Sequence, residues 1–268
     1  MLVAHIVPVS YLGKVELGRF HLVLSHLCLE SSEYYEFYRK RSWSGDIVIL
    51  DNSYFEGKMV SEKELVKLGR EISANVVVIP DRLIFKEAKE VAEGFVRICE
   101  EENVEFDLMG VCHGCDLDEF LKFYSYFSDS PGLGWIGLPA RADFLKDFEW
   151  GKKSGIKTKD LGFSRVGVLD YLEGYDLVEG YKKHHLLGCL DPIELAYSKV
   201  FPFVVGCDSS VAYVESKQKK FFGNFGIEGE REGGTKGTIN FSEKYDEKVA
   251  KIFEENALKM NRWAGYSF

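Results

Sequence analysis

The sequence lacks a long apolar run, a basic amino-terminal segment and an excess of positive charge. No apolar run reaches the roughly 18 residues that a membrane-spanning helix needs. The start, MLVAHIVPVS, has neither the basic region nor the apolar length of a signal peptide, so we expect a cytoplasmic protein without a membrane partner. The net charge of −9 argues against a protein that coats nucleic acid through bulk electrostatics, although it leaves room for a local basic patch.

Cysteine is also scarce, with six residues in 268, and no Cys-x-Cys-x-x-Cys run occurs. Most cysteines lie in or beside apolar runs, which indicates reduced, buried thiols and not a disulfide framework. The segment MGVCHGCDLDEF contains Cys112-His113-Gly114-Cys115, a pattern that suggests a metal or redox site. A structural zinc needs four ligands, and no second paired motif supplies the rest. We therefore predict no metal and no cofactor, and expect His113 to face a pocket while both cysteines are replaceable.

Eight short apolar runs alternate with helix-like segments along the chain. Strands that are apolar on both faces are typical of a parallel sheet covered by helices. The runs are VAHIVPV (3–9), HLVLSHL (21–27), DIVIL (46–50), VVVIP (76–80), FDLMGVC (106–112), GWIGLP (134–139), HHLLGC (184–189) and FVVGCD (203–208). This alternation predicts an α/β protein whose residues 1–268 form a single (β/α)8 TIM-barrel catalytic domain, with a doubly wound open sheet as the alternative.

Helix start patterns support the alternation. Ser61 with Glu64 has the form of a capping box, Asp116 with Glu119 starts another helix, and Asp191 precedes a proline at a first helical position. Ser242 is predicted to cap the last helix, whose inner stripe would be Tyr245, Val249, Ile252 and Phe253. Residues 28–45 predict a weak helix, 140–182 are long and irregular, and 209–241 predict a long loop rich in glycine and lysine.

Polar residues gather where the predicted strands end, which is where barrel enzymes carry their chemistry. Asp51 follows DIVIL, Asp81 follows VVVIP, and Asp208 ends FVVGCD. An aspartate at such a position is often the cap of the next helix. Capping explains Asp51 and Asp208 poorly, because Asp51 lies about ten residues before Ser61 and Asp208 precedes a long loop. Two carboxylates facing one cavity suit nucleophilic and acid/base work at an anomeric carbon. A third suits recognition of adjacent N–H donors such as those of guanine.

The succession ILDNSYFEG, VVVIPDRL, MGVCHG, GWIGLP, HLLGC and VVGCDSS resembles the tRNA-guanine transglycosylase superfamily. It is most similar to the short phage and bacterial branch, the 7-deazaguanine DNA transglycosylases, and the similarity runs in order from about residue 46 to 210. The resemblance implies a TIM barrel that exchanges guanine in DNA for a free 7-deazaguanine base of the preQ0 type, in the host cytoplasm if the protein is phage-encoded. The tRNA enzymes' zinc subdomain is absent, which lowers the case for a tRNA substrate.

The resemblance also implies roles for individual residues. Asp208 matches the nucleophile that attacks C1′, and Asp51 matches the general acid/base. The positions that match base recognition or the pocket walls are Asp81, Gly137, Leu138, Leu187, Gly188 and Phe55. Two matches depart from the tRNA enzymes. Asp51-Asn52-Ser53-Tyr54-Phe55 stands for Asp-Ser-Gly-Gly-Phe, and His113 stands for a glutamine that contacts the purine.

A DNA substrate requires that the target guanine leave the base stack. Lys217, Lys219 and Lys220, followed by Phe221 and Phe222, combine charge for phosphates with stacking surface, although a lysine run is often only a solvated face. Three alternatives remain open: the same exchange on tRNA, hydrolysis of a glycoside or nucleoside by Asp51 and Asp208, and a non-catalytic subunit that binds nucleic acid.

Overall fold

The computed structural model describes residues 1–140, 161–223, 226–227 and 239–265. Its centre is one parallel sheet of eight strands in the order β1-β8-β7-β6-β5-β4-β3-β2. The strands are β1 (Leu2–His5), β2 (Phe20–Leu24), β3 (Ile47–Asp51), β4 (Val76–Val78), β5 (Asp107–Val111), β6 (Trp135–Pro139), β7 (Lys183–Leu187) and β8 (Val204–Ser209). Each of the eight predicted apolar runs supplies one strand.

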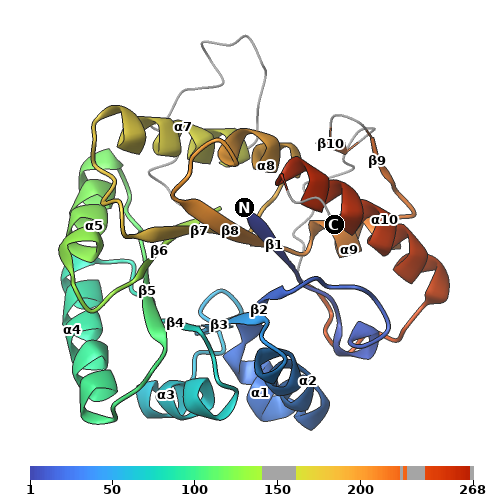
Figure 1. Ribbon diagram of the computed structural model, residues 1–268, viewed down its shortest axis with the longest axis horizontal. Coiled ribbons are helices and arrows are strands. Elements are labelled where there is room, and N and C mark those ends of the chain that lie inside the picture. The colour runs from blue at the N-terminus through green and yellow to red at the C-terminus, as the bar shows by residue number, and fades with distance from the viewer. Residues whose placement is uncertain (141–160, 224–225, 228–238, 266–268) are drawn as a thin grey trace.

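The sheet curves into a nearly closed barrel. Its two edge strands, β1 and β2, approach each other, as Figure 1 shows. The spatial order follows the chain without reversal, whereas a doubly wound sheet reverses its order at a switch point. The fold is therefore a (β/α)8 TIM barrel, and the open-sheet alternative is wrong.

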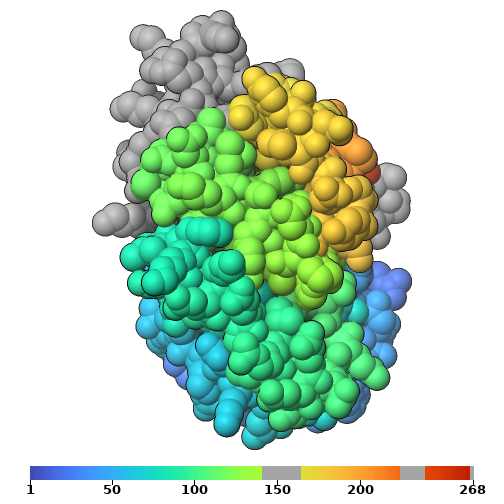
Figure 2. Space-filling model, turned by 90° about the vertical axis from the view of Figure 1, so that its left-hand side faces the viewer, coloured from blue at the N-terminus to red at the C-terminus, as the bar shows by residue number. Residues whose placement is uncertain are grey.

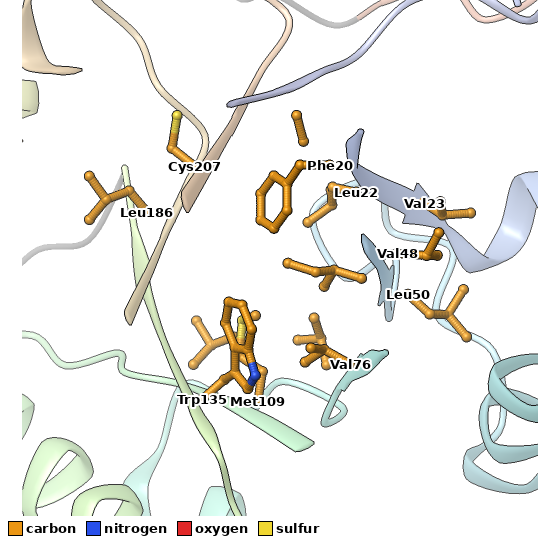
Figure 3. Close-up of a cluster of buried hydrophobic side chains, with 14 of the residues drawn as sticks. Phe20, Leu22, Val23, Val48, Leu50, Val76, Met109, Trp135, Leu186 and Cys207 are labelled. Atoms are coloured by element: carbon orange, nitrogen blue, oxygen red, sulfur yellow. The ribbon is translucent and has the colours of Figure 1, made fainter. Parts of the chain in front are cut away.

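The barrel interior is filled by side chains from opposite strands. Figure 3 shows Phe20, Met109 and Trp135 in the space between the strands. A β-carbon added at Gly206 would lie 2.5 Å from the Phe20 ring, so the ring packs directly on the backbone of β8. Three consecutive residues of β3, Val48 to Leu50, are fully buried, which confirms that this strand is covered on both faces.

Helices surround the barrel, and Figure 2 shows α4 and α5, in teal to green, on one side of it. They are α1 (Ser25–Glu30), α2 (Ser32–Trp43), α3 (Glu62–Glu71), α4 (Phe85–Glu101), α5 (Leu117–Asp129), α7 (Leu161–Gly174), α8 (Ile193–Ser198), α9 (Val211–Lys217) and α10 (Glu247–Trp263). The capping box of α3 is present as predicted, with Ser61 and Glu64 bonding reciprocally. Asp116 caps α5 by accepting the Glu119 N–H at 2.8 Å. Among the described residues, no helix is both long and apolar enough to cross a membrane.

Three sequence predictions need correction. Ser242 does not cap the last helix, because Asp246 accepts the N–H groups of Lys248 and Val249 and α10 begins after it. Tyr245 therefore lies outside α10. Its ring is partly exposed, and the centroids of the Tyr245 and Tyr11 rings are 5.0 Å apart. The predicted loop 209–241 contains α9 and a short hairpin of β9 (Phe222–Gly223) and β10 (Gly226–Ile227); its residues 224–225 and 228–238 lie outside the described residues. In the predicted irregular segment, 161–174 form α7, while 141–160 are also outside the described part.

Candidate active site

The structure brings the three strand-end aspartates together at the carboxyl end of the barrel. Asp51 is the last residue of β3, Asp81 follows β4, and Asp208 lies near the end of β8. The pKa of Asp51 is raised well above its ordinary value, first by burial, then by the charge of Glu56, and further by the charges of Asp81 and Asp208. Glu56, Asp81 and Asp208 therefore lie close enough to Asp51 for their charges to act on it.

A fixed turn holds Asp51. Its Oδ2 accepts the Ser53 N–H at 2.7 Å, and the Ser53 hydroxyl lies 2.8 Å from His26 Nδ1 and 3.0 Å from the Ser25 hydroxyl. Ser53 has φ of 59°, a left-handed conformation that is uncommon for serine. Asn52 anchors the turn to the next strand, because its amide donates to the Ile79 carbonyl at 2.7 Å. The Asn52-Ser53 pair thus serves to orient Asp51.

Asp208 is held through one carboxylate oxygen. Its Oδ1 accepts the Gly188 N–H at 3.0 Å and lies 3.1 Å from Nε2 of His185, whose ring is fully buried. The carboxylate is an acceptor, so Nε2 carries the imidazole proton. Nδ1 of His185 has no partner among the described residues. The remaining oxygen, Oδ2, carries no hydrogen bond from the part of the chain that the structure describes.

His113 lies over Asp81, with 3.6 Å between Nε2 and Oδ2, which is too long for a hydrogen bond. Its Nε2 is buried and has no hydrogen-bond partner among the described residues. The centroids of the His113 and Tyr54 rings are 6.3 Å apart. A buried polar atom without a partner is uncommon in native structures, and a role in binding or catalysis is one explanation for it. Asp81 and His113 therefore form a close pair of polar groups at the carboxyl end of the barrel.

The cysteines beside His113 lie in different environments. Cys112 is buried, and burial raises the pKa of its thiol well above the ordinary value. Cys115 is exposed, and its hydrogen bond to the Glu119 carboxylate is the main cause that raises its pKa to about 11. Gly114 separates them in a turn with φ of 140°. Neither thiol is activated, and no group of three or more His, Cys, Asp or Glu residues within the described ranges is arranged to hold a metal ion.

The predicted pocket wall lies on β6 and β7. Gly137 and Leu138 are in β6, and Leu187 ends β7. A β-carbon at Gly137 would lie 2.9 Å from Leu187 Cδ1, so these two positions are in direct contact across the strands. Gly188 follows with φ of 68°, a conformation that glycine adopts without strain.

The other predicted residues lie farther out. Phe55 is 70% exposed on the loop after β3. Lys217 pairs with Glu243 at 2.7 Å, and the backbone carbonyl of Lys220 accepts from Asn256 of α10 at 3.0 Å. Lys219, between them, is in the left-handed conformation. Phe222 is 1% exposed and packs near Trp263, so its predicted stacking role is wrong. No described contact joins the lysine segment to the aspartates.

Four residues of the site were missed from the sequence. Glu56 is exposed as a whole residue on the loop after β3, but its carboxyl is partly removed from solvent, and this burial together with the charge of Asp208 raises its pKa. His185 is one of two adjacent histidines in β7. Arg165 and Glu194 form a fully buried pair behind the pocket wall. Of these four residues, only Arg165 and Glu194 could have been suspected from the sequence. Each is a charged residue in a largely apolar helical segment, and such residues are seldom buried without a partner.

The fold and these residues define a barrel with a carboxylate site at the carboxyl ends of its strands. The sequence matches no protein-family model, and no curated protein is significantly similar to it. The function therefore has to be argued from the site itself.

Proposed function

We propose that the chain is a base-exchange transglycosylase that replaces guanine in DNA with a 7-deazaguanine of the preQ0 type. One observation carries the proposal: Asp51 and Asp208 share a site but differ in environment. Burial and neighbouring carboxylates favour the protonated form of Asp51. Asp208 instead accepts two N–H donors on one oxygen and keeps the other for reaction. An acid beside a carboxylate nucleophile is what retaining chemistry at C1′ requires.

The reaction has two displacements. Asp208 attacks C1′ while the C1′–N9 bond breaks, and guanine leaves with its bonding electrons and takes a proton from Asp51. The incoming 7-deazaguanine gives its N9 proton to the Asp51 carboxylate and attacks C1′, which breaks the bond to Asp208. Two inversions give overall retention, and no energy source is needed because one glycosidic bond replaces another.

Base recognition is assigned to the groups around this pair. Asp81 would accept the N1–H and N2 amino hydrogens of guanine, and His113 would bond a second edge of the base. Gly137 and Leu138 on β6, with Leu187 and Gly188 on β7, form the wall. These assignments follow the resemblance, and the unpartnered Nε2 of His113 supports them.

DNA binding requires contact surface around the entrance to the site, because the free-energy cost of flipping a base must be offset by other contacts with the DNA. The loops after β3 and β4 expose apolar side chains, and Arg82 joins them by approaching Met59 Sδ at 4.0 Å. The exposed residues are Phe55, Met59, Leu83 and Ile84. They offer stacking surface, and Lys217, Lys219 and Lys220 remain the proposed phosphate contacts.

Labelled guanine and a labelled 7-deazaguanine, incubated separately with the protein and either duplex DNA or tRNA, test the proposal. We expect label to enter DNA with the wild-type protein, and not with Asp208→Asn or Asp51→Asn. Asp107→Asn is the matched control, since Asp107 begins β5 at the opposite end of the barrel. Label entering tRNA only, release of base without incorporation, or DNA binding without either would contradict the proposal in favour of the tRNA, hydrolase or subunit alternatives.

A further inference from the structure

Arg165 of α7 is fully buried and makes five hydrogen bonds. Two go to the carboxylate of Glu194, at 2.6 and 2.9 Å. The other three go to main-chain carbonyls at the ends of β6 and β7: Leu138 at 2.9 Å, Leu187 at 2.8 Å and Gly188 at 3.0 Å. A guanidinium has five N–H donors, so every donor of Arg165 is used. The guanidinium of Arg165 is therefore held in one orientation.

The same peptide units contact Asp208 on their other side. The Leu187 carbonyl faces Arg165, and the N–H of the same unit, on Gly188, donates to Asp208 Oδ1. The next unit repeats this, with the Gly188 carbonyl on Arg165 and the Cys189 N–H on the Asp208 main-chain oxygen at 2.8 Å. In a trans peptide the C=O and N–H point in opposite directions. Fixing the two carbonyls therefore fixes the two N–H groups that hold Asp208.

A stabilising role alone explains Arg165 poorly. Taking two charges out of water is costly, and apolar residues of similar volume often stabilise a core as well as a buried ion pair does. The pair nevertheless bonds the carbonyls of the two peptide units whose N–H groups contact Asp208. This placement favours a role in orientation.

We propose that the buried Arg165–Glu194 pair is a positioning device for Asp208, acting through the Leu187–Gly188 and Gly188–Cys189 peptides. Together with His185, it ties Oδ1 in place and leaves Oδ2 as the oxygen that attacks C1′. The attack on C1′ rests on the proposed function; the positioning of the carboxylate does not. Arg165 is a positioning residue, because it contacts the peptides and not the reacting atoms.

Arg165→Lys is the main test variant. Lysine keeps the charge, but a single ammonium cannot reproduce the planar fork that engages Glu194 and three carbonyls together. Glu194→Gln is the second variant, which preserves shape and removes the charge that orients the guanidinium. Lys182→Met is the matched control, since Lys182 is also a buried cation on main-chain carbonyls, those of Ser130 and Leu133, but precedes the other end of β7.

Two readouts separate positioning from folding. The first is the NMR signal of the Gly188 amide in the ligand-free protein, whose proton shift reports its bond to the carboxylate. We expect the signal to move upfield in Arg165→Lys, Glu194→Gln and Asp208→Asn, and to stay in place in Lys182→Met. An unchanged Gly188 signal in a folded Arg165→Lys or Glu194→Gln protein would overturn the proposal.

The second readout is the rate of a single turnover on DNA, measured beside the DNA dissociation constant. We expect Arg165→Lys to slow the covalent step about 100-fold at unchanged DNA affinity, because a small misplacement of a reacting group has an effect of that size. An unchanged rate would overturn the positioning role. If the wild-type protein forms no covalent intermediate, the proposed function fails, and the Gly188 signal still decides whether Arg165 positions Asp208.

Discussion

Two aspartates at opposite ends of the barrel, Asp46 and Asp51, lie in opposite electrostatic surroundings. At the amino end, Asp46 lies before β3 and contacts three cationic or neutral donors: Arg41 at 2.6 Å, His21 at 3.0 Å and Arg19 at 3.2 Å. Burial alone would raise the pKa of Asp46, but its bonds to His21 and Arg19 and the charge of Arg41 outweigh burial and lower it. The negative charge of Asp46 is thus compensated by neighbouring cations.

At the carboxyl end, carboxyl groups face one another. Asp51 and Glu56 have raised pKa values because of burial and neighbouring negative charge, and Asp81 and Asp208 contribute to the effect on Asp51. Within the described residues, no lysine or arginine forms an ion pair with Asp51 or Asp208. Under the proposed function, this contrast assigns stability to the surroundings of Asp46 and chemistry to those of Asp51.

The largest expected effect is that of Asp208→Asn at the carboxyl end. We expect base exchange to fall by at least about a thousandfold, because loss of a covalent nucleophile is seldom compensated. The fold should persist, since an amide oxygen can still accept from Gly188. The measurement is the initial rate of label incorporation into DNA together with the circular dichroism spectrum. Exchange at the wild-type rate would show that the carboxyl end does not work through Asp208.

Asp46→Ala tests the opposite end. We expect the free energy of unfolding to fall by up to about 3 kcal/mol, because the change removes the acceptor of buried His21, whereas Arg19 and Arg41 can turn to solvent. Urea denaturation measures the loss. Exchange by the folded fraction should match that of the wild-type protein. A stable Asp46→Ala protein with impaired exchange would reverse the proposed roles of the two ends.

We expect acid to destabilise the fold through the buried side chain of His184. Burial lowers the pKa of His184 in β7 to about 4 from 6.5, and its Nε2 lies 2.9 Å from the Tyr124 hydroxyl. The unfolded chain therefore binds a proton below pH 6.5 that the folded chain does not, so stability falls as the pH drops from 6.5 towards about 4. A shift of this size corresponds to about 3 kcal/mol. Urea midpoints at pH 7 and pH 4.5 should differ less for His184→Gln than for the wild-type protein; equal differences would contradict the prediction.

Asp51→Asn should have the smallest effect on stability, with the opposite sign to that of Asp46→Ala. A carboxyl with a raised folded-state pKa is stabilising while protonated, and this contribution is lost as the pH rises above its unfolded value of 3.8. Asparagine cannot ionise, so the variant should unfold at a higher temperature than the wild-type protein at pH 7 and at a similar one near pH 3. Thermal melts at both values provide the measurement. A lower melting temperature at pH 7 would show that Asp51 is not under electrostatic strain.

The sequence predicted the barrel because its apolar runs are covered on both faces and recur at regular intervals, as Val48 to Leu50 illustrate. It also placed Asp51, Asp81 and Asp208 at one end, since parallel strands end together. The cap of α10 was missed because Ser242 and Asp246 are both good caps, and only tertiary contacts choose between them.

The support around the site could not be predicted. His185 and Arg165 act through atoms of residues more than 20 positions away, Asp208 and Gly188, and no local pattern encodes such contacts. The lysine segment shows the converse error. Its composition suggested an open loop, whereas Lys217 ends a helix and Phe222 enters the core because α10 packs against them.

The most direct test of the carboxyl end as a covalent site is mass spectrometry of the denatured protein after reaction with a guanine-containing DNA duplex without added base. The expected product is a covalent protein–DNA adduct in which the peptide containing Asp208 carries the sugar. Asp107→Asn should form it, and Asp208→Asn should not. An adduct attached to another residue, or no adduct although labelled base enters DNA, would contradict the assignment of Asp208 as the nucleophile.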